Sequence, residues 1–244
     1  MQLYDFLEHE TLTHLYQSML KQLLEHPMYV ASPRGMKIHE ITNATVILDP
    51  YACDLDFTIT GAPERQPVYE KYKTEELEWY LSCNTLASSA PSKFWNKLAD
   101  SAGHITSNYG SMILKEPIYP DLEGDLTAFQ KVIATLQADP DSRQAIMHYN
   151  RPEHCYVGNK DFPCTMYSQF FLRNGYLNMT TYQRSCDVIK GLVYDIPWSC
   201  HVMKMVLEEL NKIWPDLDLG EFHHVIGSLH LYEKDFELAK RIIQ

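Results

Sequence analysis

A cysteine at the junction between a loop and a strand is the first candidate for chemistry in this sequence. Cys164 follows Phe162-Pro163 and precedes a predicted strand, where a thiol is held rigidly and still reaches a cleft. A cysteine attacks as the thiolate, so it requires positive charge or hydrogen-bond donors nearby. The segment Arg184-Ser185-Cys186-Asp187 follows the returning strand and can supply them. A buried, inert thiol is the alternative for any one of the six cysteines.

Signatures of several other chemistries are absent from the sequence. It contains no Gly-rich phosphate loop, no His-Glu-x-x-His and no Cys-x-x-Cys pair. His223 and His224 are adjacent, and on a strand their side chains point to opposite faces, which is poor geometry for binding one ion. We therefore predict no metal site.

The element that must hold Cys164 is predicted to be a β-hairpin. Asn174-Gly175, the preferred pair for a type I′ turn, separates the segments 166–173 and 176–183. Further strands are predicted at 44–48, 144–149 and 222–232.

Helical periodicity is clearest in four segments, and a short helix is predicted at the C-terminus. The segments cover residues 3–24, 69–81, 126–136 and 197–214, with Pro197 in the first turn of the fourth. The apolar stripe of the first segment includes Leu3, Phe6 and Leu7. A long surface connection is predicted from Asp49 to Pro67. Helices and strands mix without strict alternation, so we predict an α+β fold with one large mixed or antiparallel sheet covered by helices.

Length and composition predict a single domain spanning residues 1–244. The chain is 45% hydrophobic, and its 32 acidic and 21 basic residues give a formal net charge of −11. This charge argues against binding nucleic acid or a membrane by bulk attraction. The start of the chain lacks a secretory pattern, and the cysteines lack the density of a disulfide framework, so we expect a cytoplasmic protein with reduced thiols.

Several short motifs together resemble the thymidylate synthase superfamily, and within it the deoxycytidylate hydroxymethylase branch of tailed phages. The resemblance extends from about Arg34 to Tyr232. It is carried by Glu76-Leu77-Glu78-Trp79-Tyr80, Phe94-Trp95, Asn108-Tyr109-Gly110, Asp139-Pro140-Asp141-Ser142-Arg143, Phe162-Pro163-Cys164, Gln169-Phe170, Gln183-Arg184-Ser185-Cys186-Asp187 with Gly191, and Gly227-Ser228-Leu229-His230-Leu231-Tyr232.

The resemblance implies a thymidylate-synthase-type fold and a set of catalytic roles. Cys164 would add to position 6 of a pyrimidine, and position 5 would then attack the one-carbon unit of 5,10-methylenetetrahydrofolate. Glu76 would act as the general acid and base through water, and Tyr109 would help to remove the proton at position 5. A solvent-facing helix acid and a simply packed tyrosine are the alternatives for these two residues.

The resemblance also implies which residues hold the two substrates. The nucleotide would be held by Gln183, Arg184, Ser185, Arg143, Asp195, His230, Tyr232 and Arg34, with His230 and Tyr232 on the sugar hydroxyl. The folate would contact Trp95, Asp187 and Gly191. In a homodimer that pairs through one face of the sheet, Arg143 would reach the partner's phosphate site. Gln144 stands where the family usually has a second consecutive arginine. The Arg34-Gly35 segment resembles the N-terminal phosphate loop of the family, with its register shifted by one residue.

Asp195 is predicted to select the base, because thymidylate synthases carry asparagine at this position. A protonated carboxyl group accepts from the amino group of cytosine and donates to its ring nitrogen, so deoxycytidylate is the expected substrate. Thr165 replaces the histidine that commonly follows the nucleophile, which favours hydration to a 5-hydroxymethyl product.

The alternatives are a reductive deoxycytidylate methyltransferase, an enzyme that uses deoxyuridylate, a catalytically inactive nucleotide-binding relative and a Cys-His hydrolase. The sequence ends soon after Arg241, which predicts a less closed folate pocket than in thymidylate synthases.

Overall fold

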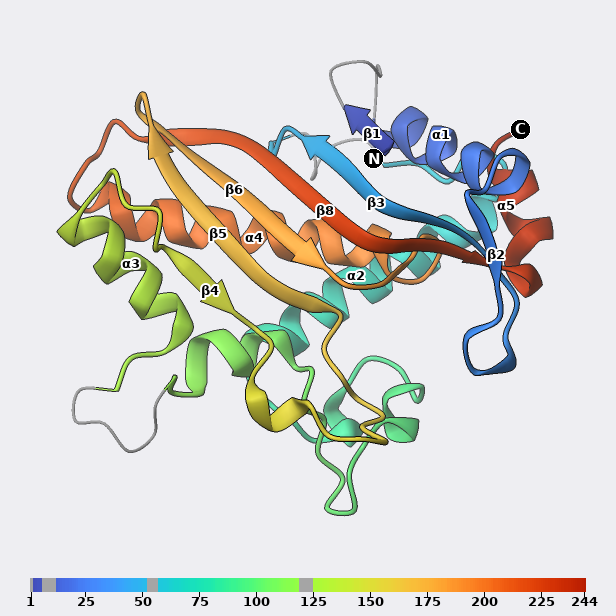
Figure 1. Cartoon of the computed structure of the whole chain (residues 1–244), viewed down its shortest axis with the longest axis horizontal. Coiled ribbons are helices and arrows are strands. Elements are labelled where there is room, and N and C mark those ends of the chain that lie inside the picture. Colours follow the sequence, from blue (N-terminus) through green and yellow to red (C-terminus); the bar gives the residue numbers. More distant parts are fainter. Residues whose placement is uncertain (1, 6–11, 52–56, 119–124) are drawn as a thin grey trace.

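One mixed β-sheet organises the chain. The computed structural model describes residues 2–5, 12–51, 57–118 and 125–244. Eight strands within them pair in the order β1-β3-β8-β6-β5-β4, with β2 beside β3 and β7 beside β8 (Figure 1). The strands are β1 (Gln2–Asp5), β2 (Tyr29–Ala31), β3 (Ile38–Leu48), β4 (Ile146–His148), β5 (Thr165–Arg173), β6 (Tyr176–Gln183), β7 (Cys186–Asp187) and β8 (Asp218–Tyr232). The helices are α1 (Leu12–Glu25), α2 (Gln66–Leu81), α3 (Ala128–Ala138), α4 (Leu192–Asn211) and α5 (Phe236–Ile242).

Strand β8 makes the sheet mixed, because it runs antiparallel to β3 and parallel to β6. Parallel neighbours require a crossover connection, and α4 supplies it between β6 and β8. Figure 1 shows α4 and α2 behind the sheet. The predicted α+β class and mixed sheet are therefore confirmed. None of the helices in the described ranges is both long and apolar enough to cross a bilayer.

The hairpin of β5 and β6 forms where the turn sequence predicts it. Asn174 and Gly175 have φ values of 52° and 82°, and both central residues of a type I′ turn require positive φ. The pairing runs from Arg173 opposite Tyr176 to Thr165 opposite Gln183. The predicted hairpin is confirmed.

The two faces of the sheet differ in burial. Along β5, Ser168, Phe170 and Leu172 are buried, and on α4 Val202 and Met203 are fully buried in the same core. The opposite face is half-buried, and the rings of Tyr167 and Tyr182 stack on it with centroids 5.8 Å apart. One sheet face is thus covered by helices within the chain, whereas the other stays partly accessible.

The N-terminal segment differs from the predicted helix over residues 3–24. Leu3 lies in β1, which pairs in parallel with β3, and α1 begins only at Leu12. Phe6 and Leu7 lie outside the described residues, as do Cys53 and part of the Asp49 to Pro67 connection. The helical prediction for Leu3 is wrong because pairing with β3 satisfies its backbone groups and overrides local periodicity.

Helix α4 begins five residues before the predicted start. The backbone N–H groups of Tyr194 and Asp195 both donate to the carbonyl of Gly191, so the helix starts from Gly191, and Pro197 lies inside it. Proline removes one backbone donor from a helix, and burial of Leu192 and Ile196 in the core offsets this loss. The prediction of Pro197 in the first turn is wrong.

Candidate active site

Cys164 lies at the open end of the hairpin, directly before β5. Its backbone carbonyl accepts from Arg184 N–H at 2.8 Å, so the two residues close the ladder side by side. The Tyr109 hydroxyl accepts from the backbone N–H groups of Cys164 and Thr165, both at 3.2 Å. The sequence predicts that Arg184 can lie beside Cys164, and the structure places the two residues side by side.

The guanidinium of Arg184 is fixed against the loop that carries Cys164. Nε donates to the carbonyl of Pro163 and Nη2 to that of Phe162, both at 2.8 Å, and Nη2 lies 3.7 Å from the Cys164 sulfur. The guanidinium also lies over the Phe162 ring, 5.0 Å from its centroid. The cation is therefore preorganised at the thiol.

Burial and charge act in opposite directions on Cys164. Burial raises the pKa of its thiol, the charges of Asp195 and Asp161 raise it further, and Arg184 and Arg34 lower it. The net pKa lies above the ordinary value for cysteine, so the thiol keeps its proton at neutral pH in the absence of a ligand.

Asp195 is held by two neighbours through one oxygen. Gln183 Nε2 donates to Oδ2 of Asp195 at 2.7 Å, and the Cys186 sulfur lies 3.7 Å from the same atom. Burial raises the pKa of Asp195 to about 6, although both hydrogen bonds lower it. The other amide atom, Gln183 Oε1, is buried without a partner in the described part of the chain. The carboxyl group of Asp195 and the amide of Gln183 can form hydrogen bonds with the polar edge of a ring.

Glu76 points into the protein, in contrast to its helix neighbours. It is 7% exposed, whereas Glu78 on α2 is exposed and Glu75 is half-buried. Tyr72 donates its hydroxyl to Oε1 of Glu76 at 2.9 Å. Burial and then the charge of Asp195 raise the pKa of Glu76 to about 8. A carboxyl group with such a pKa can give or take a proton near neutral pH.

Aromatic side chains form one wall beside Glu76. Trp95 Nε1 donates to the Tyr72 hydroxyl at 3.2 Å, and the Trp95 ring lies 4.9 Å from that of Trp79. Tyr109 is buried against Tyr80, with ring centroids 5.3 Å apart.

Asp187, His230 and Tyr232 form a second group next to Asp195. Asp187 pairs with His230 across β7 and β8, and its Oδ1 accepts from the backbone N–H groups of Ile189 and Lys190. Burial raises the pKa of Asp187, and His230 opposes this. The rings of His230 and Tyr232 are 5.1 Å apart and perpendicular, so both side chains lie on one side of β8.

Gly191 allows the backbone to pass close to both aspartates. A Cβ atom there would lie 3.0 Å from the Asp187 carbonyl oxygen and 3.2 Å from Asp195 Oδ2. Such contacts are tighter than most real ones, so a side chain at this position would press on both aspartates.

Two predicted phosphate ligands lie apart from this cluster. Arg34 is exposed in the turn Pro33–Gly35 at φ 54°, and its charge still lowers the pKa of Cys164. Arg143 is exposed before β4, whose Ile146 pairs with Gln169 and not with the Cys164 end of β5. Ser185 is half-buried directly after Arg184.

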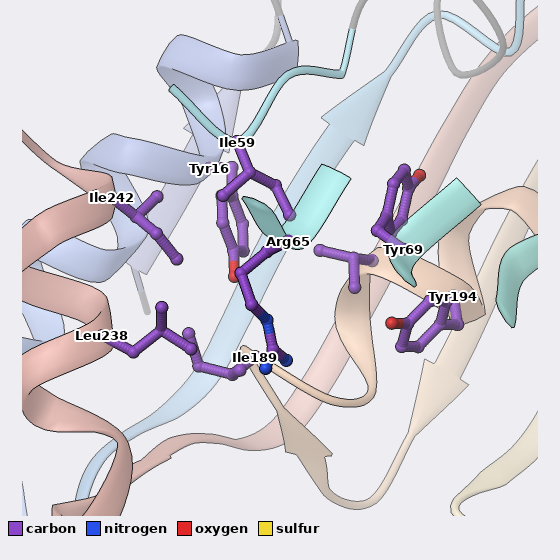
Figure 2. Close-up of a pocket in the computed structure, with 9 residues that line it drawn as sticks. Tyr16, Ile59, Arg65, Tyr69, Ile189, Tyr194, Leu238 and Ile242 are labelled. Atoms are coloured by element: carbon purple, nitrogen blue, oxygen red, sulfur yellow. The ribbon is translucent and has the colours of Figure 1, made fainter. Parts of the chain in front are cut away.

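A small, mostly apolar pocket adjoins the site on the other side of Tyr194. Figure 2 shows Arg65, its one charged lining residue, with the guanidinium beside Ile189. Tyr69 of α2 and Leu238 of α5 also line it. None of the candidate residues lines this pocket. In the described ranges, no cluster of three or more potential ligands could hold a metal ion.

Sequence reasoning missed two residues of the site, Tyr72 and Asp161. Asp161 accepts from the backbone N–H of Thr106 at 2.6 Å, from that of Ser107 at 2.9 Å, and from the Ser107 hydroxyl. Tyr72 lies four residues before Glu76, a spacing that places both on one helix face and could have been noticed. The partners of Asp161 are more than fifty residues away along the chain, and no local signal indicates them.

Comparison with known proteins agrees with the architecture. The sequence profile of thymidylate synthase matches residues 13–244. The chain is similar to the deoxycytidylate 5-hydroxymethyltransferases of Enterobacteria phages T6 and T4, at 32% identity over 226 residues, which cover 88% of this chain and 84% of each relative. It is also 36% identical, over 47% of its length, to 24% of a bifunctional dihydrofolate reductase-thymidylate synthase from Paramecium tetraurelia. The sequence match over nearly the whole chain, the mixed sheet and the hairpin that carries the cysteine lead to one conclusion: the chain belongs to the thymidylate synthase family.

Proposed function

We propose that this protein transfers a one-carbon unit from 5,10-methylenetetrahydrofolate to position 5 of deoxycytidylate, and that water completes the reaction to give the 5-hydroxymethyl nucleotide. The observation that carries the proposal is the carboxyl group of Asp195, which has a raised pKa of about 6 and lies within electrostatic range of Cys164. The relatives in phages T2, T4 and T6 are deoxycytidylate 5-hydroxymethyltransferases, which supports the same substrate and product.

Cys164 is the proposed nucleophile. Its sulfur adds to position 6 of the pyrimidine, which makes position 5 a carbon nucleophile. The thiol loses its proton to water before the sulfur adds, and Arg184, whose Nη2 lies 3.7 Å away, stabilises the thiolate. The N–H groups of Arg184 that do not bind the loop carbonyls are available to the nucleotide phosphate, together with Ser185 and Arg34.

Asp195 is the proposed reader of the base. In its neutral form the carboxyl group accepts from the exocyclic amino group of cytosine and donates to the unprotonated ring nitrogen. Gln183 supports this role because its amide N–H binds Oδ2 and fixes the plane of the carboxyl group. When the sulfur adds, the ring nitrogen gains electron density and can take the proton, which leaves a carboxylate beside the protonated base. Uracil presents the reversed donor and acceptor pattern and would leave buried polar groups unpaired.

The residues around Asp187 fit a folate, which supplies the one-carbon unit when bound. Of the two carboxyl oxygens of Asp187, only Oδ1 has hydrogen-bond partners within the described residues. Oδ2 can therefore accept from N–H groups of a pterin ring. Gly191 lets the backbone pass close to Asp187 and Asp195, and Trp95 offers an aromatic wall. Glu76 gives and takes protons at this end of the site through water, and Tyr109 assists in removing the proton at position 5.

We also propose that the protein works as a homodimer. The half-buried sheet face with Tyr167 and Tyr182 is the expected contact surface. The exposed side chain of Arg143 has no hydrogen bond or ion pair within the described ranges, so it remains able to reach the phosphate bound by the partner.

Product analysis with deoxycytidylate and deoxyuridylate, side by side, tests the proposal. We expect 5-hydroxymethyldeoxycytidylate without release of dihydrofolate. Dihydrofolate release would indicate the reductive methyltransferase, and preference for deoxyuridylate would indicate thymidylate synthesis. Failure to release tritium from position 5 of the labelled nucleotide would contradict any catalysis by Cys164.

A further inference from the structure

Tyr72 connects the buried carboxyl group of Glu76 to an indole. It lies one turn before Glu76 on α2, and its hydroxyl is 2.9 Å from Oε1 of Glu76 and 3.2 Å from Nε1 of Trp95. Its ring packs against Tyr194 of α4, with centroids 4.6 Å apart. Two hydrogen bonds therefore hold the hydroxyl, and α4 holds the ring.

The direction of both hydrogen bonds follows from the chemistry of the partners. An indole N–H only donates, so Trp95 must donate to the oxygen of Tyr72. In the described part of the chain this hydroxyl has one other partner, Oε1 of Glu76. The half-buried hydroxyl has no other acceptor among the described residues, so Tyr72 donates to Glu76.

This direction restricts where Glu76 can carry its own proton. If Oε1 accepts from Tyr72 whether Glu76 is charged or neutral, a proton on the carboxyl group has to reside on the other oxygen. We propose that Tyr72 is a positioning residue: its hydroxyl permanently occupies Oε1 of Glu76, so that Oε2 is the atom that exchanges protons with the substrate. The proposal deepens the acid and base role of Glu76 given above and rests on it for its consequence in turnover.

The surroundings of Glu76 make the contribution of Tyr72 measurable. The titratable groups that face Glu76 in the described residues are Tyr72 and Tyr80 from α2 and Asp195 and Tyr194 from α4. Burial and Asp195 raise the pKa of Glu76 to about 8, and the hydrogen bond from Tyr72 lowers it. Loss of the Tyr72 hydroxyl must then raise the pKa of Glu76 further.

Infrared titration of the full-length protein tests the proposal without any turnover. The carboxyl band of Glu76 is identified by its loss in Glu76→Gln, and its midpoint is compared between the unmodified protein and Tyr72→Phe. A hydrogen bond to a charged group is strong enough that we expect the midpoint to rise by about one pH unit. Tyr194→Phe is the matched control. Its ring belongs to the same aromatic contact, but the hydroxyl that it loses has no hydrogen bond to Glu76 in the described residues.

An unchanged midpoint in Tyr72→Phe, or an equal shift in Tyr194→Phe, would overturn the proposal. Should Tyr72→Phe fail to fold, Trp95→Phe takes its place: it removes the donor that orients the hydroxyl, so the midpoint should again rise, and an unchanged value overturns the proposal. The pH profile of turnover then separates the two levels of inference. In one outcome, the titration midpoint of Glu76 changes in Tyr72→Phe but neither the acidic nor the basic limb of the pH–rate profile shifts. Tyr72 then positions Glu76 as proposed, and the proposed catalytic role of Glu76 is wrong.

Discussion

The hydroxyl oxygen of Tyr109 accepts the backbone N–H of Cys164 at 3.2 Å and the next N–H, of Thr165, at the same distance. A buried tyrosine thus fixes the start of β5, and with it the position of the thiol. On the opposite side, the carbonyls of Phe162 and Pro163 bind Arg184. The loop before Cys164, the proposed nucleophile, is held between a neutral acceptor and a cation.

Replacing Cys164 by alanine should abolish turnover and leave nucleotide binding within a few-fold of the original affinity. The sulfur is the only atom proposed to bond to the base, whereas binding depends on other side chains. Calorimetric titration with deoxycytidylate and a product assay measure the two effects. Cys155→Ala, which alters an exposed cysteine, should behave as the unmodified protein. Substantial residual turnover in Cys164→Ala would remove this residue from the mechanism.

Replacing Asp195 by asparagine should change base preference toward deoxyuridylate. An amide presents the complementary donor and acceptor to uracil and mismatches cytosine, and we expect the ratio of kcat/KM values for the two nucleotides to change by about 100-fold. Steady-state kinetics with both nucleotides measures this ratio. Asp216→Asn, at an exposed loop position, serves as the control. An unaltered ratio in Asp195→Asn would mean that another group reads the base.

Replacing Glu76 by glutamine should stabilise the fold at neutral pH and impair activity. The pKa of Glu76 is about 8 in the fold against an ordinary value of 4.5 for glutamate, so between these pH values the folded state retains a proton that the unfolded chain has lost. Stability therefore falls as pH rises from about 4.5 to about 8, and the deficit persists above that range.

Urea unfolding of Glu76→Gln should show no gain near pH 4 and a gain on the order of 4 kcal/mol near pH 8. Glu78→Gln, an exposed position on the same helix, should show no such dependence. An equal gain at both pH values would contradict a raised pKa at Glu76.

Asp161 should stabilise the fold and should make the thiol of Cys164, the proposed nucleophile, less acidic. Asp161→Ala leaves the N–H groups of Thr106 and Ser107 without an acceptor, and we expect a loss of about 2 kcal/mol in the free energy of unfolding. Asp161→Asn keeps an oxygen for these donors and removes the charge that raises the pKa of Cys164. Alkylation of Cys164 followed by mass spectrometry should then show a lower thiol pKa in Asp161→Asn, and a higher one would refute the assigned sign.

Local patterns in the sequence predict the parts of this fold that depend on local chemistry. Asn174-Gly175 requires the backbone that it adopts, so the hairpin and the proximity of Cys164 to Arg184 could be predicted. The helix that begins at Ala128 likewise follows a capping box formed by Thr127 and Gln130.

Other parts depend on partners that the local sequence does not contain. Leu3 continues a helical stripe, and its place in β1 is decided by pairing with β3. The contact between Asp161 and Ser107 joins segments 54 residues apart. Glu76 is one of four acidic residues on α2, and its burial depends on the position of α4, which the apolar pattern alone does not provide.

The hairpin geometry has a consequence for engineering. Cys164 and Arg184 meet at one end of a ladder, and the turn at Asn174-Gly175 lies at the other end, beyond the nine residues of β5. New chain termini opened at that turn would leave the reacting end joined by its own backbone hydrogen bonds. Circular permutation at this turn is therefore a route for attaching reporters or fused domains remote from the chemistry.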